Sequence, residues 1–392
     1  MLRTIRRWIL LLPICVLWTG AWIYYHLKYY LVESPQRRPP RVHRGVETQP
    51  TGLWCCCAIY QRRKISANLM AFLTCLRNAG YNIVAVHNGP LEDSLVNHLL
   101  AVCQSVLVRT PGGRDFGSHK YGTEYLNSLA ESNLKQVVYC NDSIFIRPSI
   151  LKVFLEKLRV IPDDFIGATE SFEVHYHIQS WFFAVSGKMF ASKMFQGYFA
   201  EYRPVSYRRH VIHAGEIRLT RKLVRSQVYP NILFPADAVF KKVFSAEEKE
   251  VISQLALLSN HQTYDMLARL MSSSAKGRNT VMWPASSAAP AGQLPDYQLL
   301  SMLRRRLGDE SELQNGMNLM NLLLLTTTDF PFLKKDLVYR GGYYCIQIEQ
   351  ATDRWCGEDA AHLAEIRGYF RSREAMRWQN VFHRVFAEAG II

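Results

Sequence analysis

The 392-residue sequence predicts an α/β fold with a doubly wound, Rossmann-like sheet, an N-terminal transmembrane helix and a mostly helical C-terminal part. Apolar runs typical of strands alternate with helical patterns after residue 53. An uncharged run precedes them, and helical periodicity dominates after residue 297. The composition, 48% hydrophobic and 20% charged, excludes a disordered or collagen-like chain.

Residues 1–30 have the features of a membrane anchor. Residues 8–25 carry no charge, and as a helix they would span about 27 Å, close to the hydrocarbon thickness of a bilayer. The aromatic residues between Trp22 and Tyr30 favour a retained anchor over a cleaved signal peptide. More basic residues follow the span than precede it, which favours a single-pass protein with its main domain in the cytosol.

Residues 31–52 are basic and rich in proline, which predicts an extended linker. From residue 53 the patterns predict strands at 54–60, 81–89 and 104–109, with helices at 68–80 and 92–103 between them. This β-α-β-α-β order is typical of a right-handed, doubly wound sheet. A further helix is predicted from Ser118 to Ser132, followed by an apolar strand over 136–145.

The α/β domain is assigned to residues 53–244 and the helical C-terminal region to 245–392. Residues 273–296, rich in Ser, Ala, Gly and Pro, predict a flexible loop within that region. Nine cysteines without a CxxC pair indicate reduced thiols and agree with a cytosolic domain.

The first candidate for a binding site is the glycine-rich stretch Gly112–Gly122. Its glycines would let backbone amides approach a ligand, and a helix beginning after Gly117 would offer its N–H groups to a phosphate. A simple tight turn is the alternative, and the P-loop pattern GxxxxGK[ST] is absent.

The second candidate is Asn141-Asp142-Ser143, which lies where an apolar strand reaches the carboxyl edge of the sheet. A carboxylate at this edge can hold Mg²⁺ or Mn²⁺ that bridges a diphosphate. The alternative is that Asp142 only caps a turn.

Two later segments add polar groups. The first segment begins with Asp164 and continues to His175, His177, Gln179 and Ser180. The polar side chains of this segment could hydrogen-bond to sugar hydroxyls or supply a metal ligand. In the other, Glu216 lies within a basic run between Arg203 and Arg225. Glu216 is either a general base with arginines beside a diphosphate, or part of a solvated helix with a local ion pair.

These motifs, taken in order, resemble one family. The segments GRDFGSHKYG, NDS, DFIGATES, HIQSWFFAVSG and GEIRLT resemble the rhamnan synthesis F family of bacterial polysaccharide glycosyltransferases. Residues 329–337, DFPFLKKDL, resemble the C-terminal motif of that family. The resemblance covers residues 53–340.

The resemblance implies a glycosyltransferase A-like fold and transfer of a sugar, rhamnose or another deoxyhexose, from a nucleotide-diphosphate donor. The acceptor would be a growing cell-surface glycan, free or lipid-linked, at the bacterial inner membrane. Where the family pattern has Asp-x-Asp this chain has only Asn141-Asp142-Ser143, so dependence on a divalent cation stays open.

Roles follow for the individual residues. Donor contacts are assigned to Gly113, Asp115, Gly117, Lys120, Asn141, Asp142 and Ser143, with Asp142 as the one candidate metal ligand. Contacts to the acceptor or sugar are assigned to His177, Gln179 and Ser180. Glu216 is the first candidate for the general base and Asp164 the second, and arginines between 203 and 225 would stabilise the leaving group.

The net charge of +14 favours anionic partners. No helix-turn-helix, zinc-finger or RNP-like pattern accompanies it, so nucleic acid is not expected as a partner. Two other functions stay open: a phosphosugar transferase, and a non-catalytic membrane protein that binds acidic glycans or lipids.

Overall fold

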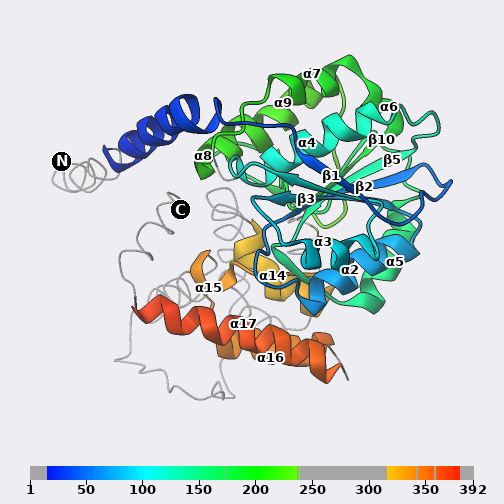
Figure 1. Cartoon of the computed structure of the whole chain (residues 1–392). Coiled ribbons are helices and arrows are strands. Elements are labelled where there is room, and N and C mark those ends of the chain that lie inside the picture. Colours follow the sequence, from blue (N-terminus) through cyan, green and yellow to red (C-terminus); the bar gives the residue numbers. More distant parts are fainter. Residues whose placement is uncertain are drawn as a thin grey trace, which may run out of the picture.

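A computed structural model describes residues 16–172, 174–235, 238, 316–340, 343–356 and 359–379. Its centre is an eight-stranded mixed sheet in the order β1-β4-β3-β2-β5-β10-β7-β11 (Figure 1). The predicted loop at 273–296 lies outside the described residues.

Four neighbouring strands of the sheet are parallel to one another and confirm the predicted β-α-β-α-β order. Its strands are β2 (Leu53–Ile59), β3 (Asn82–Asn88), β4 (Ser105–Arg109) and β5 (Gln136–Asn141). The connecting helices are α2 (Ala67–Asn78), α3 (Asp93–Leu100) and α4 (Arg114–Ser128). All four strands are buried along their whole length, as expected for a sheet covered on both faces.

The second half of the sheet contains an antiparallel strand. β10 (Phe182–Ser186) lies between β5 and β7 (Phe165–Gly167) and runs antiparallel to both, while β11 (Asn231–Ile232) is parallel to β7. Two small sheets flank this half. One pairs β12 (Phe332–Lys334) with β6 (Ile144–Ile146), and the other pairs β8 (Glu170–Ser171) with β9 (His177–Ile178).

Two boundaries differ from the sequence predictions. Residues 41–44, within the predicted linker, form β1 (Arg41–Arg44), which pairs antiparallel with β4. Helix α4 begins at Arg114 instead of Ser118, because Gly113 takes a left-handed conformation, φ 69°, and forms its N-cap. Gly117 therefore lies inside the helix.

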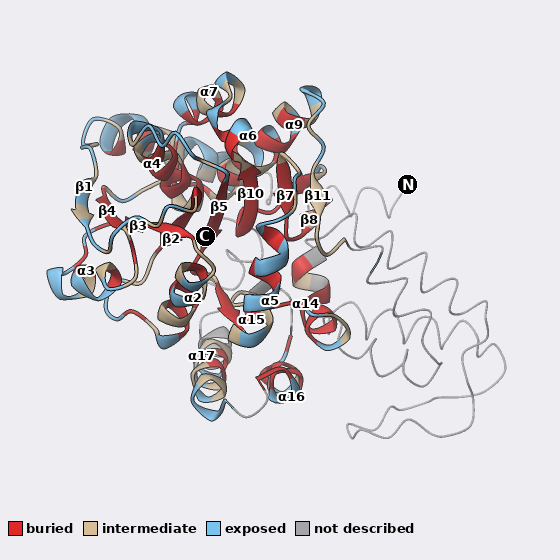
Figure 2. Cartoon of the chain, turned by 90° about the vertical axis from the view of Figure 1, so that its right-hand side faces the viewer, coloured by how far each residue is buried: buried red, intermediate tan, exposed pale blue. Residues whose placement is uncertain are grey.

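Two apolar layers cover the sheet, and neighbouring cysteines of β2 point into different ones. Cys55 and Cys57 belong to the layer with α2, α3 and α5 (Pro148–Leu158), and Cys56 to the layer on the other face. That second layer is formed by α4, α6 (Gly187–Ala191), α7 (Lys193–Glu201) and α9 (Arg218–Arg225). Figure 2 shows the buried strands between these helices.

The described C-terminal residues share the first layer. They form α14 (Gly316–Thr327), β12, α15 (Leu337–Arg340), α16 (Cys345–Cys356) and α17 (Ala360–Gln379). Leu323, Trp355 and Phe370 are buried in the same cluster as α2 and α5, so these elements are packed onto the sheet domain.

The N-terminal helix lies against the segment that precedes α8 (Arg208–His210). Residues 16–28 are α-helical and continue as the π-helix η1 (Tyr29–Glu33). The ring of Tyr25 stacks on that of Tyr207 at 5.4 Å, and Ser206 Oγ donates to Glu33 at 3.0 Å. No helix in the described part of the chain is long and apolar enough to cross a bilayer. The predicted span of 8–25 falls partly on residues 1–15, outside that part.

Candidate functional site

Polar side chains gather at the carboxyl edge of the parallel strands. Asn141 ends β5 and Asp142 follows it, while Asp115 lies in the first turn of α4. Asn141 Nδ2 donates to Asp115 Oδ2 at 3.2 Å, which joins the glycine-rich segment to the strand end. The fold therefore brings two sequence-predicted donor motifs into direct contact.

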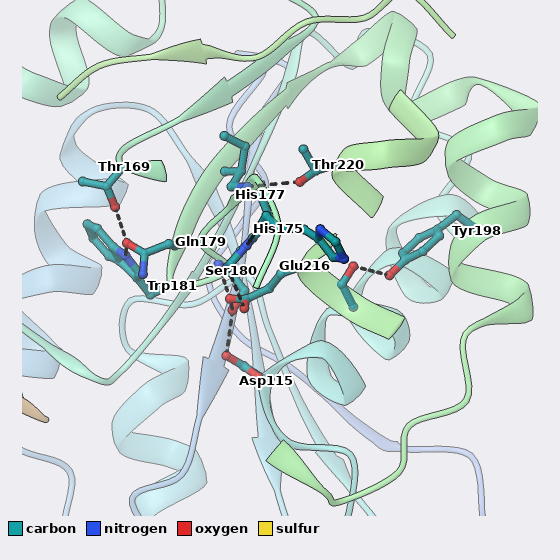
Figure 3. A network of polar contacts seen from close by, with 12 residues as sticks. Asp115, Thr169, His175, His177, Gln179, Ser180, Trp181, Tyr198, Glu216 and Thr220 are labelled. Carbon is teal, nitrogen blue, oxygen red and sulfur yellow. Dashed lines mark hydrogen bonds and ion pairs between the residues drawn. The ribbon is translucent and has the colours of Figure 1, made fainter. Parts of the chain in front are cut away.

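Ser180 connects this pair to Glu216 (Figure 3). Its hydroxyl oxygen lies 3.1 Å from Asp115 Oδ2 and 2.6 Å from Glu216 Oε1. Its backbone N–H donates to the same Glu216 oxygen at 2.8 Å. Two carboxylates that are 101 residues apart in the numbering thus face one hydroxyl group.

Glu216 lies on a π-helix, η2 (Val211–Ile217), between α8 and α9. π-Helical turns occur often at functional sites, because the widened turn redirects side chains and releases carbonyl groups. Tyr198 Oη donates to two such carbonyls, those of Ala214 at 2.8 Å and Gly215 at 2.9 Å. A side chain at Gly215 would meet the ring of Phe116 at 2.9 Å, so glycine permits this close packing.

His177 supports the second oxygen of Glu216. Its Nε2 lies 3.6 Å from Glu216 Oε2, and its Nδ1 is 2.7 Å from the carbonyl oxygen of His175. His177 is buried, so its ring contacts other residues of the protein. Gln179 is also buried, and its Oε1 accepts from Thr169 Oγ1 at 2.7 Å. These two side chains, predicted to meet the acceptor, face other parts of the chain.

Asn141 and Ser143 close a tight turn at the end of β5. Asn141 Oδ1 accepts from the N–H of Ser143 at 3.1 Å and from its hydroxyl at 2.5 Å. This side chain to backbone bonding ends the strand at Asn141 and separates it from β6. The predicted strand over 136–145 is therefore two strands with a turn between them.

Asp142 is the middle residue of this turn and lies beside Lys335, a residue from the far end of the sequence. Its Oδ2 accepts from the N–H of Tyr60 at 3.0 Å, and its carbonyl oxygen accepts from Lys335 Nζ at 2.7 Å. Burial raises the pKa of Asp142, and the ammonium of Lys335 acts against that rise. Burial also lowers the pKa of Lys335, with Asp142 acting in the opposite direction.

His119 is a buried member of the site to which the sequence prediction gave no role. Its Nε2 lies 3.3 Å from the carbonyl oxygen of Ser180. Burial lowers its pKa from 6.5 to about 4, so the ring is neutral at pH 7. His119 follows Asp115 by four residues, and residues at i and i+4 share a helix face. This spacing could have predicted that His119 lies near the site.

Arg109 is a second group that sequence reasoning missed. It ends β4, and its guanidinium donates to the carbonyl oxygens of Thr110 at 3.1 Å and Arg114 at 2.8 Å. Its Nε donates to Ser118 Oγ at 3.1 Å. These bonds hold the loop that leads into α4 and so fix the position of Asp115.

Several predicted residues lie elsewhere. Gly113 and Gly117 face protein: a side chain on Gly113 would collide with Pro204, and one on Gly117 would lie 3.0 Å from Arg109. Lys120 Nζ donates to the carbonyl oxygens of Phe199 at 2.6 Å and Ala200 at 2.9 Å, at the end of α7. Neither glycine nor this lysine is joined to the Ser180 network.

Asp164 is at the opposite edge of the sheet. Its Oδ1 accepts from Ser186 Oγ at 2.5 Å, and Ser186 pairs with Gln136 at the start of β5. Asn141 and the carboxylate network lie at the other end of that strand. The structure thus separates the second candidate base from the first.

The arginines of the basic run face the N-terminal helix. Arg203 and Arg218 line a cavity of about 690 Å³ together with Trp22, Tyr30 and Tyr202. Arg203 donates to Tyr30 Oη at 2.5 Å, and Arg218 lies 3.6 Å from Glu201. In the described part of the chain the two arginines contact Tyr30 and Glu201 and do not join the Asp115–Glu216 network.

The residues at the strand end do not make a good divalent-metal site. Asp142 is the one carboxylate of the Asn-Asp-Ser turn, and the amide oxygen of Asn141 already accepts two hydrogen bonds. In the described ranges no three His, Cys, Asp or Glu side chains are grouped as metal ligands. Mg²⁺ and Mn²⁺ prefer free carboxylate oxygens, so this donor set does not match them.

The chain is similar to one family model and to two curated proteins. Residues 83–266 match the family model described as rhamnan synthesis protein F. The chain is 23% identical over 197 residues to the uncharacterised protein y4gN of Sinorhizobium fredii, a match covering 49% of this chain and 51% of that protein. It is 33% identical over 111 residues to the virulence protein VirA of Vibrio anguillarum, covering 28% and 34%.

The chain therefore spans about half the length of one of these curated relatives and about a third of the other. The family match contains Asp115, Asn141, Ser180 and Glu216, while Lys335 lies beyond it. It confirms the resemblance predicted from the order of the motifs. Over residues 83–266 the chain is similar to the rhamnan synthesis protein F family, a likeness that suggests involvement in polysaccharide synthesis.

Proposed function

We propose that the protein is a glycosyltransferase that moves a sugar from a nucleotide-diphosphate donor to a growing cell-surface glycan, free or lipid-linked. The observation that carries the proposal is the convergence of Asp115 and Glu216 on the hydroxyl of Ser180, beside the carboxyl end of β5. Open α/β sheets bind ligands at this edge. The family match supports polysaccharide synthesis as the setting.

The sheet order also supports a glycosyltransferase A-like fold. Four parallel strands are followed by the antiparallel strand β10, inserted between β5 and β7. This insertion leaves the end of β5 next to the turn that carries Ser180. The donor diphosphate would lie near Asp142, and the nucleoside or sugar would be held from Asp115.

Glu216 is proposed as the general base. It would take the proton from the attacking hydroxyl of the acceptor as that oxygen bonds to the anomeric carbon. The bond between the anomeric carbon and the donor phosphate oxygen breaks in the same step, and the nucleoside diphosphate leaves. Oε1 is held by two bonds from Ser180, which leaves Oε2, 3.6 Å from His177 Nε2, to accept the proton.

A donor screen tests the proposal. The purified chain is incubated with nucleotide sugars, deoxyhexose donors included, and with a glycan acceptor, and the released nucleotide is identified. A glycosyltransferase releases the nucleoside diphosphate. Binding of one class of donor should also raise the temperature at which the protein unfolds. Release of a nucleoside monophosphate instead would indicate the phosphosugar transferase. Binding of acidic glycans without turnover of any donor would contradict both enzymes.

A further inference from the structure

We propose that Lys335, and not a divalent metal, supplies the positive charge that faces the donor diphosphate. This inference rests on the proposed glycosyl transfer and names the group that neutralises its leaving nucleotide. Three observations carry it: the position of Lys335 at the strand end, the burial of its ammonium among groups that orient it, and the poor metal donor set around Asp142.

The position of Lys335 is fixed by backbone pairing. β12 runs antiparallel to β6, with Lys334 opposite Ile144, so the next residue reaches the Asn141–Ser143 turn. The N–H of Lys335 donates to the carbonyl oxygen of Ser143 at 2.9 Å. Its Nζ then bonds the carbonyl oxygen of Asp142 at 2.7 Å. The ammonium is therefore held at the Asn141–Ser143 turn, which follows the carboxyl end of β5.

The surroundings of the ammonium hold it in one direction, and its acidic neighbours oppose the lowering of its pKa by burial. It lies 4.9 Å from the ring centre of Phe145 and 5.9 Å from that of Tyr369, both within cation–π range. Asp142 and Glu365 contribute negative potential. One bond to a carbonyl oxygen leaves two N–H donors on the ammonium, enough for two phosphate oxygens.

A metal would have to share this place with the ammonium. Asp142 Oδ2 already accepts from Tyr60 N–H, and the ammonium would repel a second cation beside it. The amide oxygen of Asn141 is bonded to Ser143, as described above. With one carboxylate and one lysine in place of two carboxylates, the motif has no formal net charge. A diphosphate can then bind directly to the protein.

The first test measures nucleoside diphosphate binding by calorimetry on the full chain. UDP, dTDP and GDP are titrated separately in EDTA and in Mn²⁺. We expect at least one of them to bind with a Kd that differs by less than about 2-fold between the two conditions. A requirement for Mn²⁺ would overturn the inference while leaving the glycosyltransferase in place. Absence of binding by all three in both conditions would instead contradict the proposed function.

The second test uses variants. Lys335→Met keeps the length of the side chain and removes the charge, and we expect it to weaken diphosphate binding by at least about 10-fold. Lys335→Arg keeps the positive charge and should retain most of the affinity for the diphosphate. Binding of the matching nucleoside, which has no phosphate, should be the same in all three proteins. Circular dichroism shows whether Lys335→Met is folded, and Lys335→Gln takes its place if it is not.

Lys188→Met is the matched control. This lysine is 89% exposed and lies near Asp164 at the other edge of the sheet. Its removal lowers the net charge by the same amount, so it reports any general electrostatic effect on nucleotide binding. We expect wild-type affinity. Equal weakening by Lys188→Met and Lys335→Met, or wild-type diphosphate affinity in Lys335→Met, would overturn the inference.

Discussion

Asp115 and Glu216 face the same proton donor, the hydroxyl group of Ser180, from 3.1 and 2.6 Å. A serine hydroxyl has one hydrogen, so it can donate to only one of the two carboxylates at a time. The shorter distance is to Glu216, whose oxygen also accepts from Ser180 N–H. The network therefore couples the proposed donor-binding carboxylate to the proposed base.

Replacing Ser180 with Ala should uncouple these carboxylates. The backbone bond from residue 180 to Glu216 persists, but no hydroxyl separates the two negative groups. We expect kcat to fall on the order of 10-fold to 100-fold in a glycosyl-transfer assay, with the fold unchanged. Ser128→Ala, which removes an exposed hydroxyl from the end of α4, is the control. Unchanged kcat in Ser180→Ala would remove the hydroxyl from the mechanism.

Glu216→Gln should separate binding from chemistry. The glutamine keeps the size of the side chain and removes its basicity. We expect donor binding as in the wild type and a loss on the order of 10² to 10⁴ in kcat, the usual contribution of a general base. Single-turnover kinetics with a saturating donor would measure this loss. Full turnover in the variant would assign the proton to another group.

Asp115→Asn should act on the donor instead. Asp115 Oδ2 accepts from Asn141 Nδ2. If the amide nitrogen of the new asparagine took the place of Oδ2, two N–H donors would face each other there. We expect kcat/KM to fall mainly through a higher KM for the nucleotide sugar. If Asp115→Asn and Glu216→Gln weakened donor binding equally, the division of roles between the two carboxylates would be wrong.

Tyr198→Phe should loosen the π-helix. It removes the hydroxyl that donates to the carbonyls of Ala214 and Gly215, and two buried acceptors then lose their partner. We expect a loss of about 1–3 kcal/mol in the free energy of unfolding, together with a lower kcat. Tyr202→Phe is a matched control, because its buried hydroxyl has no hydrogen-bond partner in the described structure. That variant should unfold at or above the wild-type temperature.

Stability should fall on acidification because His119 is buried and neutral. Its pKa is about 4 in the folded chain, against 6.5 for an exposed histidine. The unfolded chain therefore binds more protons between these values. The contribution of the neutral His119 to the free energy of unfolding is complete above pH 6.5 and is lost as pH falls toward 4. Burial lowers the pKa of His210 to about 4 as well, so both residues contribute.

Thermal unfolding at intervals from pH 7.5 to 4 measures this effect. His119→Gln keeps a side-chain N–H that can donate to the carbonyl oxygen of Ser180 and does not titrate in this range. The melting temperature of this variant should fall less steeply with acid than that of the wild type. The same steepness in both proteins would show that His119 is not the group responsible.

The sequence predicted the parallel half of the fold well, because its apolar runs and capping residues are local signals. β3 lies within its predicted range, α2 begins one residue before its predicted range, and the strand before Asp142 leads to the expected edge. The direction of β10 could not be read in the same way, since an apolar run does not specify parallel or antiparallel pairing. Asp164 directly precedes β7, which runs in the same direction as β5, so it lies at the edge where β5 begins and far from Asn141.

The candidate site was predicted in part. Asp115, Asn141, Ser180 and Glu216 were singled out one by one, and the fold brings them together. Lys120 lies apart from these four residues, because its side chain bonds to the end of α7. The contact between Lys335 and Asp142 could not be predicted from local sequence patterns, because 193 residues separate them in the sequence.

The pairing of β12 with β6 also affects the order in which the molecule is completed during synthesis. β2, β3, β4 and β5 come from the first part of the chain and can pair early, whereas β12 must close a much longer loop. A nascent chain released before residue 332 would contain Asp115, Asp142 and Glu216 without the lysine that accompanies them. It would also leave the buried residues Ile144, Phe145 and Ile146 without their partner strand, exposing an edge open to pairing with another chain.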